Sequence, residues 1–279
     1  MTLTNVREIL LHVAKSLPAA PQILAKLGHL RLEPDADLGE ATGILKVDAA
    51  LTARILRIAN SPAYTSGAPY ASLEQALARV GFVEIYRIAG VAAVAQLATQ
   101  GLKMYGVGGA GLRENSLLTA LVMEEVATST PIDPQEAYSA GLLRSTGKVA
   151  LDGLKKDVAA AYDPAADGDL VEWEERRAGV TNCEAAAFVL TEWRFPSSLV
   201  SAIGHHYRPE LCPGDRVLTH LLSLAAGESD RLGFGLPGER PFLAATAERL
   251  EEAGIDRGRL EAGSAAAFRR FEVIRPTLG

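Results

Sequence analysis

The stretch VDAALTARILRIANSPAY, residues 47–64, followed by SLEQALARVGFVEIYRIAG, residues 72–90, decides the fold of this chain. In the first stretch, Leu51, Ile55 and Ile58 recur at the three- and four-residue spacing that places apolar side chains on one face of a helix. The second stretch has the same helical composition and leads into a third helical segment. The two stretches together predict three consecutive helices.

The ends of these helices can be read from their capping residues. Asp48 is of a residue type that accepts hydrogen bonds from the first backbone N–H groups of a helix, so it caps the first one. Ser72, with Gln75 three residues later, has the spacing of a capping box for the second helix. Gly81 ends that helix, and residues 82–100 are predicted to form the third.

The composition predicts an all-α protein. Alanine, leucine, glutamate and arginine are abundant, aromatic residues make up 6%, and no run alternates apolar with polar β-branched residues. With 279 residues, of which 48% are hydrophobic, a chain of this size buries about 75% of its unfolded surface. The sequence therefore predicts a large helical interior.

The segment YGVGGAG, residues 105–111, is the strongest break in composition, because its glycines remove helix propensity. We interpret it as a hinge between two helical lobes. The chain then divides into an N-terminal helical lobe, residues 1–108, a second lobe, residues 109–235, and a C-terminal helical extension, residues 236–279, packed on the second lobe. The extension carries FRRFEVIRP, residues 268–276, an amphipathic segment suited to docking on the second lobe or on a partner.

Charge and hydropathy exclude several classes of partner. The formal net charge is −6 and the pI is near 5.5, so nucleic acid is not expected as a partner. The longest apolar stretch, residues 88–95, is far shorter than the ~20 residues that cross a bilayer, so no membrane insertion is expected. Cys183 and Cys212 lack any paired motif and are expected to be reduced thiols of a cytoplasmic protein.

The residues quoted above and several further segments resemble the HDOD domain of bacterial signalling proteins. The resemblance covers roughly residues 15–230 and rests also on SLPAAPQILAKL (16–27), EAYSAGLLRSTGKVAL (136–151), GVTNCEAAAFVLTEWRFP (179–196) and SAIGHHYRPE (201–210). It implies a two-lobed helical fold whose second lobe is a degenerate HD-like lobe. It also implies a non-catalytic, regulatory role in signal transduction. The protein would act by recognising a signalling protein partner, and a small ligand is a further candidate as the regulator of that recognition.

The resemblance further assigns positions to the metal ligands of the wider HD superfamily, whose active members hydrolyse phosphate esters. Such ligands must be imidazoles and carboxylates, which bind a divalent cation and let it acidify a water. In this sequence the positions hold Asn115, Arg144, Ser145, Asn182 and Ala226, whereas His205 and His206 are retained. Arg144 would place a permanent cation where the metal should sit. We therefore expect no metal, no other cofactor and no catalytic residue.

A second hypothesis makes the protein a nucleotide or cyclic-dinucleotide sensor. An arginine fork with amide and hydroxyl donors suits phosphate better than metal. The vestigial pocket would then consist of Asn115, Arg144, Ser145, Lys148, Asn182, His205 and His206. Against this, a buried Arg144 would more often pair with a local carboxylate such as Glu114 or Glu184.

A third hypothesis is a divergent metal-dependent phosphohydrolase. It would use His205 and His206 together with carboxylates whose positions in space the sequence does not give. The carboxylates to test are Asp133, Asp152, Glu184 and Glu210. This hypothesis predicts bound metal and an activity that His205→Ala removes.

Overall fold

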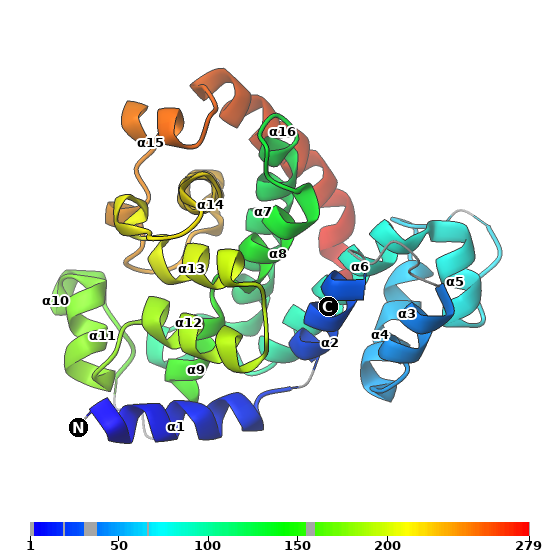
Figure 1. The fold of residues 1–279 in the computed structure, drawn as a ribbon, viewed down its shortest axis with the longest axis horizontal. Coiled ribbons are helices and arrows are strands. Elements are labelled where there is room, and N and C mark those ends of the chain that lie inside the picture. The colour runs from blue at the N-terminus through cyan, green and yellow to red at the C-terminus, as the bar shows by residue number, and fades with distance from the viewer. Residues whose placement is uncertain (1–2, 19, 31–37, 66, 155–159, 279) are drawn as a thin grey trace.

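The computed structural model describes residues 3–18, 20–30, 38–65, 67–154 and 160–278. Within these ranges all the regular structure is helical, and the only β-type pairing is an isolated bridge between Leu102 and Val107 (Figure 1). The prediction of an all-α, two-lobed helical fold is confirmed. No helix in the described part of the chain is long and apolar enough to cross a membrane.

The first lobe is built around α6, against which α2 and α4 pack. Its helices are α2 (Ala20–Leu30), α3 (Leu38–Leu45), α4 (Ala49–Ala59), α5 (Leu73–Val80) and α6 (Phe82–Leu97). The predicted caps are present: Asp48 accepts from the backbone N–H of Leu51 at 2.9 Å, and Ser72 accepts from that of Gln75 at 3.3 Å. The Gln75 side chain bonds instead to the backbone of Ala71, so the capping box is incomplete.

Only part of the predicted hinge, residues 105–111, is a turn in the structure: a tight turn ends at Val107, and residues 109–111 form the first residues of the next helix, Gly109–Ala127. Leu102 and Val107 exchange two backbone hydrogen bonds of 2.7 and 3.0 Å across this turn. The short helix η1 (Lys103–Tyr105) lies inside the turn with Tyr105 buried, and Gly106 has a φ of +66°, which glycine adopts without strain. The segment therefore fixes the direction of the chain between the lobes.

The second lobe contains most of the remaining helices. They are α7 (Gly109–Ala127), α8 (Pro134–Leu143), α9 (Thr146–Leu154), α10 (Pro164–Asp167), α11 (Leu170–Ala178), α12 (Asn182–Glu192), α13 (Ser197–His205), η2 (Pro209–Leu211) and α14 (Arg216–Ser229). Two glycines allow close helix pairs. A Cβ on Gly141 would lie 2.7 Å from Cα of Ala120 on α7, and one on Gly147 would lie 1.7 Å from the carbonyl oxygen of Asn182 on α12.

The C-terminal part continues from α14 through η3 (Asp230–Phe234), η4 (Arg240–Phe242), α15 (Ala247–Glu252), α16 (Arg257–Ile274) and η5 (Arg275–Leu278). Helix α16 packs along α7 (Figure 1). At the N-terminus, α1 (Leu3–Ser16) packs against α9 and α12, where the indole N–H of Trp193 donates to the carbonyl of Ala14 at 3.1 Å. The division at residues 108 and 235 remains a proposal, and α1, α6 and α16 each have contacts that lie across it.

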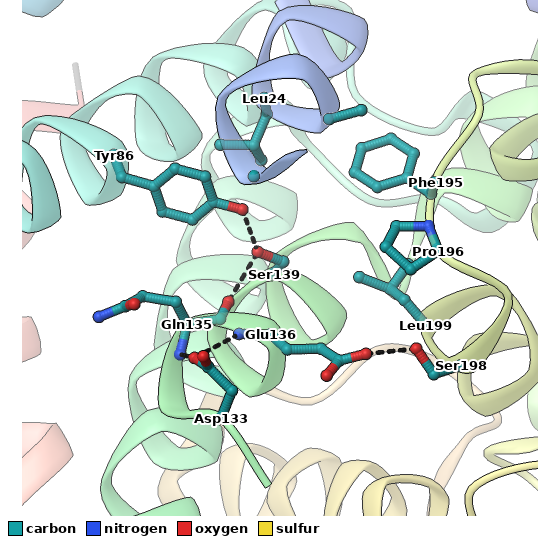
Figure 2. A pocket seen from close by; sticks show the side chains of 12 residues that line it. Leu24, Tyr86, Asp133, Gln135, Glu136, Ser139, Phe195, Pro196, Ser198 and Leu199 are labelled. Atoms are coloured by element: carbon teal, nitrogen blue, oxygen red, sulfur yellow. Dashed lines mark hydrogen bonds between the residues drawn. The ribbon is translucent and has the colours of Figure 1, made fainter. Parts of the chain in front are cut away.

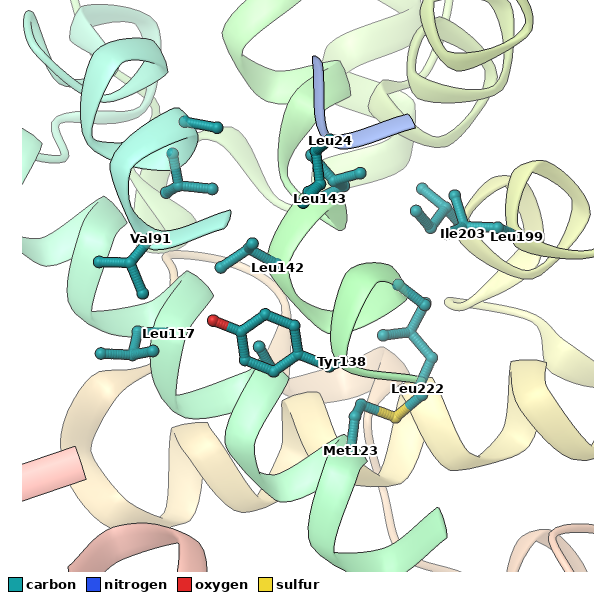
Figure 3. Close-up of a cluster of buried hydrophobic side chains, with 14 of the residues drawn as sticks. Leu24, Val91, Leu117, Met123, Tyr138, Leu142, Leu143, Leu199, Ile203 and Leu222 are labelled. Atoms are coloured by element: carbon teal, nitrogen blue, oxygen red, sulfur yellow. The ribbon is translucent and has the colours of Figure 1, made fainter. Parts of the chain in front are cut away.

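The two lobes share one hydrophobic core. Figure 3 shows side chains from both lobes converging on Tyr138 and Leu142 of α8, including Leu24 of α2, Val91 of α6 and Leu117 of α7. The Tyr138 hydroxyl donates to the backbone carbonyl of Arg87 at 3.1 Å. Helix α8 therefore joins the lobes, and its C-terminal end carries the first residue of the candidate site.

Candidate functional site

The candidate site is a cluster of four buried charged residues in the second lobe. Arg144, directly after α8, and Lys148 on α9 are the cations; Glu174 on α11 and Glu239, just before η4, are the carboxylates. None is more than 1% exposed. Arg144 Nη1 donates to Glu239 Oε2 at 2.9 Å, while Lys148 Nζ lies 3.4 Å from Glu239 Oε1 and 3.6 Å from Glu174 Oε1. Two positive charges thus meet two negative charges away from water.

Two tyrosines complete the shell around the carboxylates. The Tyr105 hydroxyl donates to Glu174 Oε1, and the Tyr207 hydroxyl donates to Glu239 Oε1, both at 2.8 Å. Lys148 Nζ also lies 4.4 Å from the centroid of the Tyr105 ring, a cation–π distance. Burial, followed by the adjacent carboxylates, raises the pKa of both phenols well above their usual value, so they stay protonated as donors.

Two asparagines supply the amide partners of the cluster. Asn182 donates to Glu174 from its backbone N–H at 2.7 Å and from its side chain at 3.0 Å. Asn115 accepts from Arg144 Nη2 at 2.8 Å and donates to the carbonyl of Phe234 at 2.7 Å. Asn115 therefore joins Arg144 to η3, the segment that leads to Glu239.

His206 is a neutral member of the cluster. Its Nδ1 lies 2.7 Å from the carbonyl of Ile203, so Nδ1 carries the proton, and Nε2 faces Arg144 Nη1 at 3.4 Å as the acceptor. Burial, and then the charge of Arg144, lowers the pKa of His206 to about 3. The neighbouring thiol of Cys183 has a pKa raised well above its usual range, first by burial, so it is an inert thiol.

Glu239 is ionised despite its burial. Burial by itself raises the pKa of this carboxyl, but Arg144, then Lys148, and finally a hydrogen bond from Tyr207 bring that pKa down to about 2. The carboxylate thus behaves as an internal anion bound by an arginine and a lysine.

These residues do not fit the metal of the HD superfamily. The side-chain oxygen of Asn115 already accepts a hydrogen bond from Arg144, and the side chain of Ala226 on α14 has no ligand atom. Both carboxylates of the cluster already face internal cations, which would repel a divalent ion. Among the described residues, no group of three or more His, Cys, Asp or Glu side chains is arranged to hold a metal.

Five of the seven residues predicted for the vestigial pocket come together: Asn115, Arg144, Lys148, Asn182 and His206. The other two do not. Ser145 lines a separate small cavity with Val94 and Leu112, and its hydroxyl has no partner within the described residues. His205 is half-buried and bonds through Nδ1 to the carbonyl of Ser201 at 2.8 Å.

The partner of Arg144 was predicted wrongly. Glu114 instead bonds to Arg275 at 2.6 Å, on the outer side of α7. Glu184 forms a complete capping box with Thr181 at the start of α12. Both carboxylates are close to the cluster in sequence, but each points away from it, and Glu239 takes their place from 95 residues further along the chain.

The other carboxylates of the phosphohydrolase hypothesis have local structural contacts. Asp133 caps α8 by accepting from the backbone N–H of Gln135 at 2.7 Å. Asp152 accepts from the backbone N–H of Met104 at 2.6 Å. Glu210 is exposed and lies 3.9 Å from Arg249.

A second feature is a cavity of about 250 Å³ between the lobes. Figure 2 shows its polar side, where the Tyr86 hydroxyl lies 2.7 Å from Ser139 Oγ and Glu136 accepts from Ser198 Oγ. Its apolar wall includes Leu24, Phe195, Pro196 and Leu199. Because α2, α6, α8 and α13 all line it, a small molecule there would contact both lobes.

The chain belongs to the HDOD domain family, whose model matches residues 17–209. Among solved structures, an HDOD domain protein of unknown function from Geobacter sulfurreducens is 20% identical with a TM-score of 0.71, over 99% of this chain and 98% of that one. A provisionally named signal transduction protein from Marinobacter aquaeolei VT8 is 21% identical with a TM-score of 0.72, over 99% of this chain and 66% of that one.

A third similar structure, a provisionally named phosphohydrolase from Shewanella amazonensis SB2B, is 25% identical with a TM-score of 0.69, over 97% of this chain and 98% of that one. No curated protein matches the chain. The likeness to these solved structures establishes the fold.

Proposed function

We propose that this protein is a non-catalytic regulatory component of bacterial signal transduction that acts by binding a protein partner. The observation that supports this proposal is the buried ion pair between Arg144 and Glu239, with Lys148 and Glu174 beside it. The family resemblance assigns the position of Arg144 to a metal ligand of the HD superfamily. The proposal places the protein in the cytoplasm, where its two buried free cysteines stay reduced.

A hydrolase of this superfamily needs coordination positions that are open to a metal and to a water. Here the corresponding volume is filled by buried side chains, and both carboxylates accept hydrogen bonds from within the cluster, although Lys148 Nζ and Arg144 Nε have no hydrogen-bond partner among the described residues. To admit a divalent cation, Glu239 would have to leave Arg144, which would strand an unpaired buried charge at a cost of about 3–5 kcal/mol. The arrangement therefore favours a structural role for the cluster.

The test combines metal binding with turnover. Thermal unfolding is measured with Mn²⁺, Mg²⁺ and chelator, and hydrolysis of phosphate monoesters, phosphodiesters and cyclic dinucleotides is assayed in parallel. We expect no metal-dependent change in Tm and no hydrolysis above buffer, because a metal that binds the native state must raise Tm by mass action. A metal-specific rise in Tm, with hydrolysis that His205→Ala or His206→Ala abolishes, would instead support the phosphohydrolase hypothesis.

The nucleotide-sensor hypothesis requires an anion to displace Glu239, since the cluster is already neutral. Saturable nucleotide binding that Arg144→Ala removes would favour this alternative. The cavity between the lobes offers a more accessible place for a gating ligand, because it contacts both lobes without breaking the buried ion pairs.

A further inference from the structure

A groove of about 660 Å³ lies between the first lobe and α16. One wall comes from the segment after α4 and from α5, with Tyr64, Tyr70, Arg79 and Val80; the other comes from α16, with Arg269 and Val273. The C-terminal end of α16 reaches toward α6 in Figure 1. We call this feature the α16 groove.

The FRRFEV segment explains why α16 presents these side chains. Phe268 and Phe271 turn inward and pack with Phe234, with ring centroids 6.2 and 4.9 Å from it. Arg270 is held by Glu124 at 3.0 Å and Glu125 at 2.8 Å. These contacts leave Arg269 exposed on the side of the groove.

The charge in the groove is not balanced. Its one carboxylate, Glu84, is already paired with Arg87. Arg79 and Arg269 are both exposed, and neither has an ion-pair or hydrogen-bond partner among the described residues. Two uncompensated cations therefore flank the groove in a chain whose formal net charge is −6.

The same groove exposes apolar surface. Val273 lines the groove and is 59% exposed. Val80, Tyr64 and Tyr70 are half-buried along the wall. The groove therefore has an apolar strip with a cation on each side. A peptide segment in which carboxylates flank an apolar side chain is complementary to this arrangement.

We propose that the α16 groove binds an acidic segment of a protein partner, with carboxylates on Arg79 and Arg269 and an apolar side chain against Val80 and Val273. This inference rests on the proposed function and names the surface that would perform it. One wall of the groove comes from α16, which lies beyond residues 17–209 matched by the family model. Partner choice would thus depend on an element outside the matched region.

The test uses a short fluorescent peptide in which glutamates flank a leucine and a phenylalanine, titrated into the full-length protein. We expect saturable binding that weakens with salt and falls about tenfold in the double variant Arg79→Glu, Arg269→Glu, because two attractive charge pairs become repulsive. Val273→Asp should weaken binding as well. Circular dichroism and Tm confirm that each variant is folded.

The matched control is the double variant Arg177→Glu, Arg208→Glu, which changes net charge equally at exposed arginines outside the groove. An equal loss in both double variants would show a non-specific charge effect and overturn the proposal. So would the absence of peptide binding, or binding of labelled ATP or a cyclic dinucleotide that needs Arg79 and Arg269. None of these outcomes depends on the hydrolysis assay, so the proposed function and the groove fail separately.

Discussion

Arg144 and Glu239 are separated by 95 residues of sequence, yet their side chains are 2.9 Å apart and almost fully buried. The pair fixes the segment before η4 to the end of α8. If either residue alone is replaced by a neutral one, the other is left as an unpaired charge in the protein interior, which solvates charge poorly.

We predict that Glu239→Gln and Arg144→Met each lower the free energy of unfolding by about 3–5 kcal/mol, and that the double variant loses much less than the sum. Urea unfolding of the four proteins gives this double-mutant cycle directly. If the two losses simply added, the pair would not be coupled and the cluster would not act as a unit.

The helix boundaries were the most predictable part of the molecule, because capping is a local interaction. Asp48 and Ser72 are read from the sequence as caps, and their side chains accept from backbone N–H groups in the structure. The partner of an amphipathic helix is not a local property. The apolar face of α1 predicts burial, but nothing in it distinguishes the first lobe from α9 and α12, where it packs.

The site was predictable only in part for a similar reason. The family resemblance located Arg144, and charge balance then requires a nearby buried carboxylate. The chain has 34 acidic residues, and Glu239 lies in a glycine- and proline-rich segment without a periodic pattern. Glu174 likewise lies in LVEWEERRAG, residues 170–179, whose many charged residues are typical of an exposed helix. Only the tertiary fold selects these two.

Acid should destabilise the native state through His206 and Glu239. The pKa of His206 is lowered by burial to about 3 when folded, so between about pH 6.5 and 3 the unfolded chain binds a proton that the native state does not. Stability therefore rises with pH across this window, by up to about 1.4 kcal/mol per pH unit. Glu239, with a folded pKa of about 2, adds a loss of stability as pH falls from about 4.5 to 2.

The measurement is the free energy of unfolding in urea as a function of pH, for the wild type and for His206→Asn. The variant should have a smaller slope between pH 6.5 and 4.5, where Glu239 contributes little. An unchanged slope would show that His206 titrates alike in the folded and unfolded chains.

Gly147→Ala should be strongly destabilising, because the added methyl would lie 1.7 Å from the carbonyl oxygen of Asn182. Relief requires α9 to move away from α12, which also displaces Lys148 and Asn182 from Glu174. We expect a loss of about 3 kcal/mol or more.

Gly43→Ala is the matched control. Gly43 is exposed within α3, and nothing lies within 4 Å of its added Cβ. The change should stabilise the protein by about 0.5–1 kcal/mol. The measurement is the Tm of each variant in thermal unfolding. If both substitutions shifted Tm in the same direction, this account would be contradicted.

The attachment of α1 to the second lobe should depend on Trp193. Its indole N–H donates to the carbonyl of Ala14, one of the last four carbonyls of α1, which lack partners within the helix. Trp193→Phe keeps most of the apolar contact but leaves that carbonyl without its donor, at a cost of about 1 kcal/mol. Hydrogen exchange in α1 should then accelerate several-fold, while exchange in α14 stays unchanged.

The control is Trp173→Phe, which makes the same chemical change on α11. There the indole packs against Tyr105 and Tyr162, so the change should leave α1 protected. Equal acceleration in both variants would mean that α1 reports global stability and that its hold on the second lobe does not depend on this hydrogen bond.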